Sequence, residues 1–522
     1  MRAGGLLWAM PAMLVLVLAG CQRAAVPPAG AKVDIEWFPG GVEQARAAAA
    51  AQHKPVFLYW GAEWCPPCHD LKAHVFSRRD FQEKMRQFIP VYLDGDADGA
   101  QRIADQYRVS GYPTAVVLAA DGAEITRIAG GMDLTRYADV LDLALENVRP
   151  VAQLLSAVQE GAALDASDCR RLAYNGWLLQ PDAESAAATL STSLEQAALA
   201  CRGHGSVEHD RLMLTAAGLA AGHERSAIEA GKPASAQVRR LLDDMSSLLA
   251  DRQRALRVAD TLLDVGEDCL SVSHRLHPDR DAVLLTQWQS VMDALETDPG
   301  YSGTVQLMSA AGRLYAAKVL SSDGVIPQAV QDRARRTLDA FMARQHGPDE
   351  RAGIVNSASW VLTYLKDDAR LRMLLEGEIT TSRTAYYYMP DLADVYERAG
   401  DKVAALQWLE RGYRESRGPA TRFQWGALYL HGLLRMAPEE TARIQAASVQ
   451  VLGELQGADR IHGRARQRLE RLGAELTSWS RVPAHAAAGN AIRQRWQGIC
   501  AALPAQDAAR GDCPGLLPLA GI

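Results

Sequence analysis

The sequence has no excess of positive charge. Its 522 residues include 56 Lys and Arg against 62 Asp and Glu, which gives a formal net charge of −6. Binding to nucleic acid depends largely on a basic surface that neutralises phosphates. The Arg-rich stretches at 464–471 and 493–495 alternate with apolar residues, a pattern typical of solvated helix faces. We therefore predict no nucleic-acid partner.

Long apolar runs are also lacking after the N-terminus, so no later segment is predicted to span a membrane. At the N-terminus, Arg2 precedes a mostly apolar stretch over 6–18. An apolar segment of this length followed by small residues is typical of an export signal. We interpret residues 1–20 as a signal peptide, and residues 21–32, which are small and contain prolines, as a linker.

The signal segment ends in Leu18-Ala19-Gly20-Cys21, which resembles the bacterial lipobox. The resemblance implies cleavage before Cys21 and lipid attachment to that cysteine, whose acyl chains would anchor the protein in the bilayer. Gln22 takes the place of the Asp that retains enteric lipoproteins in the inner membrane, which favours the outer membrane. We predict a lipid-anchored protein of the bacterial cell envelope that faces the periplasm. An uncleaved signal anchor, or a signal peptide with a chance cysteine, is the alternative.

Two cysteines lie three residues apart in Trp64-Cys65-Pro66-Pro67-Cys68, directly after the apolar run 56–60. A strand that leads into a helix places the first thiol at the helix N-terminus, where free amides and the helix dipole stabilise a thiolate. We expect Cys65 to be an exposed nucleophile, and Cys68, one turn into the helix, to resolve the mixed disulfide. The pattern predicts thiol–disulfide exchange.

Three other interpretations of this motif are weaker. Cys65 to His69 also satisfies the c-haem attachment string, but the preceding strand favours redox chemistry, as does the family resemblance given below, and we expect His69 on a helix surface. A zinc site would need a second ligand pair, which the sequence lacks. A purely structural disulfide rarely closes so short a loop. We predict no metal and no cofactor.

Five cysteines lie outside the lipid site and the Cys-x-x-Cys pair. In an oxidising compartment some of them are expected to pair. The shortest loops join Cys169 to Cys201 and Cys500 to Cys513 and leave Cys269 unpaired, but other connectivities stay open.

Residues 33–148 alternate between helical and strand patterns. We predict helices at 41–52, 65–76, 100–107 and 134–145 and strands at 55–60, 88–93, 114–119 and 124–129. From residue 149 to residue 522 strand signals nearly vanish, and the sequence is periodic at helical spacing. The fold class predicted is an α/β domain over 33–148 followed by a large all-α region over 149–522.

Residues 54–68 and the loop Val109-Ser110-Gly111-Tyr112-Pro113-Thr114 together resemble the thioredoxin superfamily, and the lead-in looks closest to its periplasmic reductase branch. The resemblance covers about 115 of the 522 residues. It implies a central mixed sheet with flanking helices and a cis Pro113 beside the cysteines. It also implies that Trp64, Tyr112 and Pro113 contact the substrate.

The sequence departs from that family at the position of its buried Asp, where Tyr59 stands, and no Lys partner is evident near Val91. The proton acceptor for Cys68 is therefore not identified. Glu63 is close in sequence but is expected to be a solvated rim residue.

In the all-α region, residues 392–413 form two apolar stripes around Gly400-Asp401, which resembles a tetratricopeptide-type helix pair. We predict a solenoid-like region with degenerate repeats. The aromatic residues at 386–388 and 423–429 are interpreted as core, with a peptide-binding surface as the alternative.

These patterns favour an envelope thiol–disulfide oxidoreductase that reduces disulfides of exported proteins and takes its electrons from a membrane thiol donor. An isomerase is also compatible with the motif. The alternative from another class is a scaffold or assembly lipoprotein, which binds partner proteins through its helical repeats and carries a minor thioredoxin-like appendage.

Overall fold

A computed structural model describes residues 34–129, 134–145, 149–179 and 183–518 of the chain. The predicted signal peptide, the lipidation site Cys21 and the linker lie outside these residues. Residues 35–522 form one compact unit, and the division at 148/149 stays a prediction. No helix in the described ranges combines the length and apolar character needed to cross a membrane.

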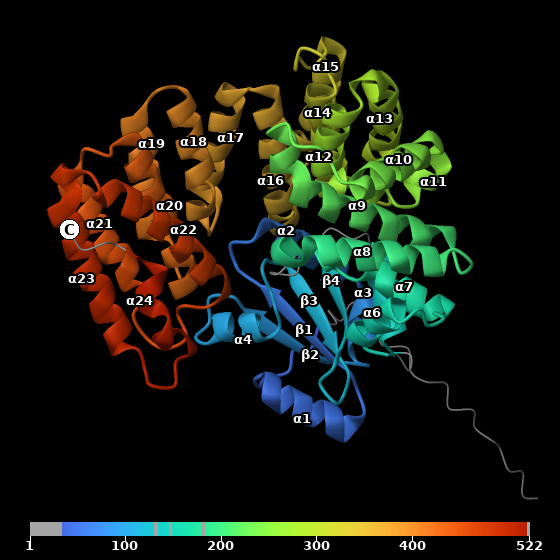
Figure 1. Ribbon diagram of the computed structural model, residues 1–522, viewed down its shortest axis with the longest axis horizontal. Helices are drawn as coiled ribbons and strands as arrows, with labels where there is room; N and C mark the ends of the chain where they lie inside the picture. Colours follow the sequence, from blue (N-terminus) through green and yellow to red (C-terminus); the bar gives the residue numbers. More distant parts are fainter. Residues whose placement is uncertain (1–33, 130–133, 146–148, 180–182, 519–522) are drawn as a thin grey trace, which may run out of the picture. The chain divides into compact units, whose positions relative to one another are not determined.

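Four strands form a mixed sheet in the order β2-β1-β3-β4 (Figure 1). Strand β1 pairs parallel with β2 and antiparallel with β3, which pairs antiparallel with β4. All four strands were predicted within one residue or two at each end. Their bounds are β1 Val56–Gly61, β2 Ile89–Asp94, β3 Thr114–Leu118 and β4 Glu124–Ala129.

The central strand β1 is buried along its whole length. Its alternate side chains point to opposite faces of the sheet, so Phe57 and Tyr59 belong to one apolar cluster while Leu58 and Trp60 belong to another. An unbroken apolar run is what a strand covered on both faces requires. The strand therefore ends inside the molecule, and Ala62 and Cys65 after it are buried.

The α/β part contains five helices in the described residues, and four of them match predicted segments. The exception is α3, whose short and highly charged sequence gave no helical signal. Helix α2 continues into a π-helical turn over Lys72–Phe76. The bounds are α1 Val42–Gln52, α2 Pro66–Leu71, α3 Arg79–Met85, α4 Ala100–Gln106 and α5 Leu134–Leu145.

Beyond residue 149 the described residues contain helices and no strand, as predicted (Figure 1). The bounds are α6 Val151–Gln159, α7 Ala166–Tyr174, α8 Ala183–Cys201, α9 Ser206–Glu229, α10 Ala236–Ala250, α11 Arg252–Leu256, α12 Ala259–Leu276, α13 Asp281–Thr297, α14 Gly303–Val319, α15 Gln328–Met342, α16 Pro348–Leu365, α17 Asp368–Thr381, α18 Met389–Arg398, α19 Lys402–Glu415, α20 Pro419–Met436, α21 Thr441–Gly453, α22 Gly463–Ser480, α23 Ala486–Ala502 and α24 Cys513–Leu516.

The predicted helix pair at 392–413 corresponds to α18 and α19, which pack against each other. Gly400 lies between them with a φ of 83°, a left-handed conformation that glycine adopts without strain. The helix pair is thus confirmed, while its assignment to a tetratricopeptide-type repeat stays a prediction.

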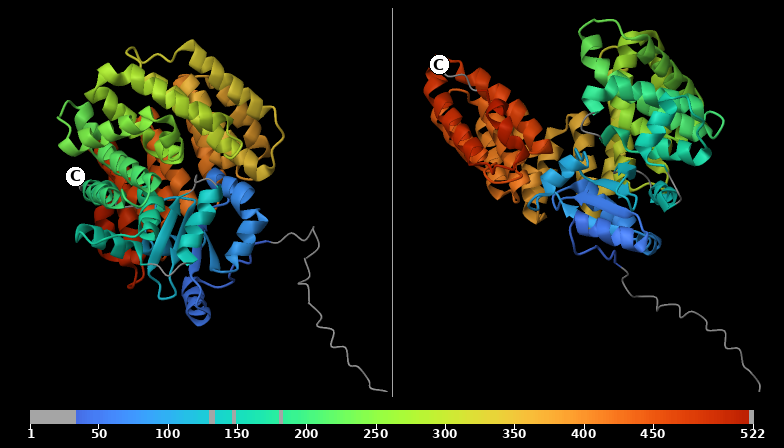
Figure 2. Two further views of the ribbon diagram at one scale, coloured as in Figure 1. Left: turned by 90° about the vertical axis from the view of Figure 1, so that its right-hand side faces the viewer. Right: turned by 60° about the horizontal axis from the view of Figure 1, so that its bottom comes forward.

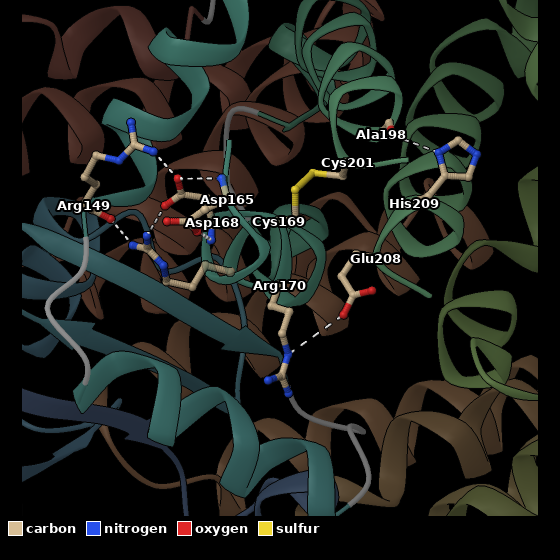
Figure 3. Close-up of a disulfide and its surroundings, with 10 residues drawn as sticks. Arg149, Asp165, Asp168, Cys169, Arg170, Ala198, Cys201, Glu208 and His209 are labelled. Carbon is tan, nitrogen blue, oxygen red and sulfur yellow. Dashed lines mark hydrogen bonds and ion pairs between the residues drawn. A yellow bond between two sulfur atoms is a disulfide. The ribbon is translucent and has the colours of Figure 1, made fainter. Parts of the chain in front are cut away.

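Two disulfides tie helices of this region together. One joins Cys169 of α7 to Cys201 of α8, and Figure 3 shows it beside the ion pair between Arg149 and Asp168. The other joins Cys500 of α23 to Cys513 at the start of α24. Cys269 is buried and unpaired. Both pairings expected from loop length are confirmed.

The helical region contacts the α/β part at several places, of which three are described first (Figures 1 and 2). Next to β4, the backbone N–H of Gly176 donates to the carbonyl of Arg127 at 2.8 Å. Helix α16 packs against α2, and helix α22 packs against α4. The last two contacts bring distant helices to the end of the sheet where the Cys-x-x-Cys segment lies.

Candidate active site

Cys65 and Cys68 form a disulfide at the N-terminus of α2. Cys65 caps the helix, and its Sγ accepts the backbone N–H of Cys68 at 3.2 Å. Pro66 and Pro67 occupy the first turn, where a missing N–H costs no internal hydrogen bond. The local geometry is the one predicted, with the first sulfur at a helix terminus that stabilises negative charge.

The expectation that Cys65 is exposed is wrong for this structure. Its residue is 2% exposed and Cys68 is 1% exposed. Trp64 and Tyr112 pack against the cysteines and cover them. Because Trp64 is in turn held by the helical region, the cover extends beyond the α/β part.

Trp64 lies among aromatic rings from the helical region. Its ring stacks on Tyr387 with centroids 6.1 Å apart, and meets Trp425 of α20 edge-on at 5.3 Å. Tyr386, Tyr388 and Trp425 are buried, so the interpretation of these aromatic residues as core is confirmed for them. Part of that core is the cover over the redox pair.

Asp96 fixes the indole of Trp64. The Nε1–H of Trp64 donates to Asp96 Oδ2 at 3.2 Å, and Thr421 donates to the same carboxylate from its N–H at 2.9 Å and its Oγ1 at 2.7 Å. Burial raises the pKa of Asp96, and the hydrogen bonds from Thr421 and Trp64 oppose that shift. Gly418, with a φ of 80°, lets the start of α20 approach, because a Cβ there would lie 2.5 Å from Asp96 Cβ.

The peptide bond between Tyr112 and Pro113 is cis, as the family resemblance implied. The Tyr112 hydroxyl accepts a hydrogen bond from Gln101 Nε2 at 2.9 Å, and its ring meets Trp64 with centroids 6.2 Å apart. The guanidinium of Arg464 lies 5.0 Å from the centre of the Tyr112 ring. Burial raises the pKa of the Tyr112 hydroxyl. Trp64 and Tyr112 thus lie together at the cysteines, while contact of Trp64, Tyr112 and Pro113 with a substrate stays a prediction.

Tyr59 does not replace the family's buried Asp as a proton acceptor. Its side chain is 1% exposed, and its hydroxyl has no hydrogen-bond partner in the described part of the chain. Burial, with the nearby Tyr92, raises its pKa far above the ordinary value, so the hydroxyl stays protonated. Glu63 is exposed, as expected. No ionisable group in the described ranges is shown to receive the proton of Cys68.

His69 was expected on a helix surface, and it is only partly exposed because it lies at the contact between α2 and α16. Its Nδ1 lies 2.5 Å from Asp349 Oδ1 on α16, and its Nε2 lies 2.6 Å from the carbonyl of Glu63. Both ring nitrogens therefore contact protein groups. His69, which completes the Cys-x-x-Cys-His pattern of c-haem attachment, thus joins α2 to the helical region.

Asp70 makes the second polar link between α2 and the helices. It accepts hydrogen bonds from Thr304 Oγ1 at 2.8 Å and Ser302 Oγ at 3.3 Å, and it lies 3.1 Å from His74 Nδ1. The hydrogen bond to Asp70 is the main cause that raises the pKa of His74. Gly353 of α16 leaves room for this junction, since a Cβ there would lie 2.5 Å from Thr304 Oγ1.

A cavity of about 540 Å³ opens beside this junction. Pro67, Tyr112 and Pro113 line it from the α/β part, while α12, α13, α14 and α16 supply the opposite walls. Neither Cys65 nor Cys68 lines it. The cavity thus adjoins the residues that flank the disulfide but does not expose the sulfurs.

Comparison with known proteins agrees with this geometry. Residues 42–145 match a family model described as Thioredoxin-like domain. The Thiol:disulfide interchange protein DsbD of Cronobacter sakazakii is 33% identical over 97 residues, which cover 18% of this chain and 17% of that protein. The Thiol:disulfide interchange protein DsbD 2 of Pseudomonas aeruginosa is 29% identical over 123 residues, or 22% of this chain and 21% of that protein.

Among solved structures, a thioredoxin from Thermus thermophilus is 27% identical and covers 21% of this chain and 85% of its own, with a TM-score of 0.20. The chain spans only 17% and 21% of the lengths of the two curated relatives. Their likeness is therefore confined to one domain. The family match places a thioredoxin-like domain over residues 42–145, with the Cys65–Cys68 disulfide inside it.

Proposed function

We propose that the protein is a thiol–disulfide oxidoreductase of the bacterial envelope that reduces disulfides of exported proteins. The observation that carries this proposal is the Cys65–Cys68 disulfide, which lies at the N-terminus of α2 in a thioredoxin-like domain that also contains cis Pro113. The names of the curated relatives, thiol:disulfide interchange proteins, support the same class of reaction.

The reaction begins from the dithiol. The Cys65 thiolate attacks one sulfur of the substrate disulfide, an intermolecular disulfide forms, and the other substrate sulfur leaves as a thiolate. Cys68, as its thiolate, then attacks Cys65 Sγ and releases the second substrate thiol. Two electrons pass to the substrate, and the enzyme is left with the Cys65–Cys68 disulfide.

The backbone N–H of Cys68 supports the first step, because it donates to Cys65 Sγ and stabilises negative charge there. Each turnover consumes the dithiol, so a dithiol donor must reduce the Cys65–Cys68 disulfide again. A membrane-embedded thiol donor fits an envelope protein held by a lipid on Cys21, with its catalytic domain facing the periplasm.

Access to Cys65 requires movement of its cover. Cys65 as a residue is 2% exposed, so a protein disulfide cannot approach its sulfur in line while the cover is in place. We assign the movement to Trp64, because its ring is the cover that bridges the cysteines and the helical region. A substrate that displaces Trp64 would reach Cys65 from the side of Tyr112.

Reduction of insulin by dithiothreitol-regenerated protein tests the proposal. The wild type should turn over, Cys65→Ser should be inactive, and Cys68→Ser should accumulate mixed disulfides with exported proteins. The double variant Cys65→Ser/Cys68→Ser is the control for trapping through Cys269. Absence of turnover together with absence of adducts on Cys68→Ser would exclude a reductase.

One observation favours the alternative of a scaffold lipoprotein, namely that helical residues bury the redox pair. A scaffold would bind the same partner as wild type and as Cys65→Ser, and neither protein would turn over disulfides. Co-purification of partners with both proteins, measured beside insulin reduction, separates the two functions.

A further inference from the structure

We propose that the cavity between α2 and helices α12, α14 and α16 binds the segment of a substrate that carries basic and apolar side chains next to its disulfide. This inference rests on the proposed function and names the class of substrate. It follows from the position, the aromatic wall and the charge of the cavity.

The position of the cavity suits a segment that flanks a reacting disulfide. Pro67 lies between the two cysteines, and Tyr112 packs against them and precedes cis Pro113. All three residues line the cavity. Its volume of about 540 Å³ falls within the range of sites that bind ligands. A chain bound there would hold its neighbouring cysteine at the edge of the redox pair.

One wall of the cavity is aromatic. Trp360 of α16 is 50% exposed although it is a large apolar residue. It lies beside Tyr364, with ring centroids 6.5 Å apart, and Tyr364 meets Tyr315 of α14 at 5.9 Å. Exposed aromatic faces in a concave site bind apolar side chains and also attract the cations of Lys and Arg.

The charge of the lining disfavours an acidic occupant. Neither Lys nor Arg belongs to it, whereas four carboxylates do: Asp70, Asp260, Asp264 and Glu267. Three of these carboxylates have a basic neighbour: Asp70 pairs with His74, Asp260 with Arg211, and Glu267 with Arg225.

Asp264 is different, because it makes no hydrogen bond or ion pair with the described residues. Its side chain is exposed to the cavity, yet the protein around it limits its hydration. That loss of hydration and the nearby Asp260 raise the pKa of Asp264 to about 7, against the opposing effect of Arg211. A bound ammonium or guanidinium would supply the missing countercharge.

The experiment compares two peptides with the reduced, full-length protein. Each carries one cysteine as a mixed disulfide with 2-mercaptoethanol, flanked by Leu and by either two Lys or two Glu residues. Single-turnover rate constants are measured for both peptides and for hydroxyethyl disulfide, which is too small to need the cavity. We expect the basic peptide to react about 10-fold faster than the acidic one at low salt, with the difference shrinking as salt is added.

Variants locate the preference. Trp360→Ala and Asp264→Asn should each slow the basic peptide by about 2- to 30-fold, the range of cation–π and charge contacts, and leave hydroxyethyl disulfide unchanged. Val403→Ala and Asp279→Asn are the matched controls, since both residues are exposed and neither lines the cavity. The controls should behave as wild type with all three substrates.

The outcomes separate this inference from the proposed function. Equal rates for the two peptides, or a preference that Trp360→Ala and Asp264→Asn leave intact, would overturn the cavity proposal while the reductase stands. If even hydroxyethyl disulfide is not reduced, the proposed function fails. Calorimetric titration of the oxidised protein with Cys→Ser versions of both peptides then tests the cavity proposal independently of the reaction. We expect the basic peptide to bind more tightly than the acidic one, and equal binding would contradict the cavity proposal.

Discussion

The helical region packs tightly against one side of the Cys65–Cys68 pair and leaves a cavity on the other side. We call one side the closed side; it consists of Trp64, Asp96, Tyr387, Thr421 and Trp425. Aromatic stacking and hydrogen bonds join these residues. The cavity that remains beside Trp64 has a volume of about 10 Å³. On the other side, which we call the open side, α12, α14 and α16 do not pack closely against the cysteine region and leave a cavity of about 540 Å³. The same region therefore both covers the cysteines and shapes the space beside them.

The difference teaches that burial of a reactive group and exposure of its surroundings are separate properties. The closed side controls whether Cys65 can react, because Trp64 lies on it. The open side controls what reacts, because its walls carry exposed aromatic and acidic groups. Substitutions on the two sides should accordingly change different measurements.

Trp64→Ala should have the largest effect. Without the indole, alkylation of Cys65 in the reduced protein should become roughly 10- to 100-fold faster, which corresponds to about 1.4–2.7 kcal/mol of local opening free energy. Peptide mapping after timed treatment with N-ethylmaleimide measures the rate. Trp360→Ala, on the open side, is the matched control and should leave the rate unchanged. Equal rates in Trp64→Ala and wild type would show that Trp64 is not the cover.

Gly353→Ala should perturb the open side next. An added Cβ would lie 2.5 Å from Thr304 Oγ1 of α14 and 3.2 Å from Asp70 Oδ1 of α2, so the Thr304 side chain or α16 itself must move, which disturbs the hydrogen bond between Thr304 and Asp70. Overpacking of this kind costs about 1–3 kcal/mol in the free energy of unfolding, which urea denaturation measures. Gly377→Ala on α17, where nothing lies within 4 Å of the added Cβ, is the control and should be neutral or stabilising.

The sequence was informative wherever neighbours along the chain determine the structure. The strands and the helix that begins after Cys65 follow from apolar runs and from a motif that spans a few residues, whereas cis Pro113 was implied only by the resemblance to the thioredoxin superfamily. The two cysteine pairings with the shortest loops, among connectivities that the sequence left open, are the ones the structure shows, and Cys169 and Cys201 lie on consecutive helices. Helix α3 was not predicted because most of its residues are charged or polar, although three of its side chains are buried in the structure.

The sequence was uninformative where the partners lie hundreds of residues apart. The burial of Cys65 depends on Trp64 meeting Tyr387, and on Asp96 accepting hydrogen bonds from Thr421. No local pattern marks those pairs. The partner that fixes Asp96, Thr421, lies 325 residues away in the sequence. The cavity is likewise assembled from separate helices, none of which carries a recognisable motif.

Thr421→Val should have a smaller effect on the closed side. It removes the Oγ1 donor to Asp96 but keeps the backbone N–H donor, so Trp64 loses part of its support. One hydrogen bond contributes about 1 kcal/mol, and Cys65 alkylation should rise about 5-fold. Thr380→Val is the control, because its Oγ1 bonds only a carbonyl of its own helix. A rate equal to wild type would mean that Asp96 holds Trp64 without Thr421.

The effect of Asp264→Asn on stability should depend on pH. Because the pKa of Asp264 is raised to about 7 in the folded protein from its ordinary value of 3.8, ionisation costs stability as the pH rises from about 4 to above 7. The Asn variant lacks this cost, so its midpoint of thermal unfolding should exceed that of wild type at pH 8 and equal it at pH 4. Asp279→Asn should show no such dependence. If Asp264→Asn is stabilising at pH 8 and still slows the reaction of the basic peptide, the carboxylate serves binding at the expense of stability, as is common for binding sites. If the variant is instead less stable than wild type at pH 8, the conclusion that Asp264 on the open side lacks a countercharge is wrong.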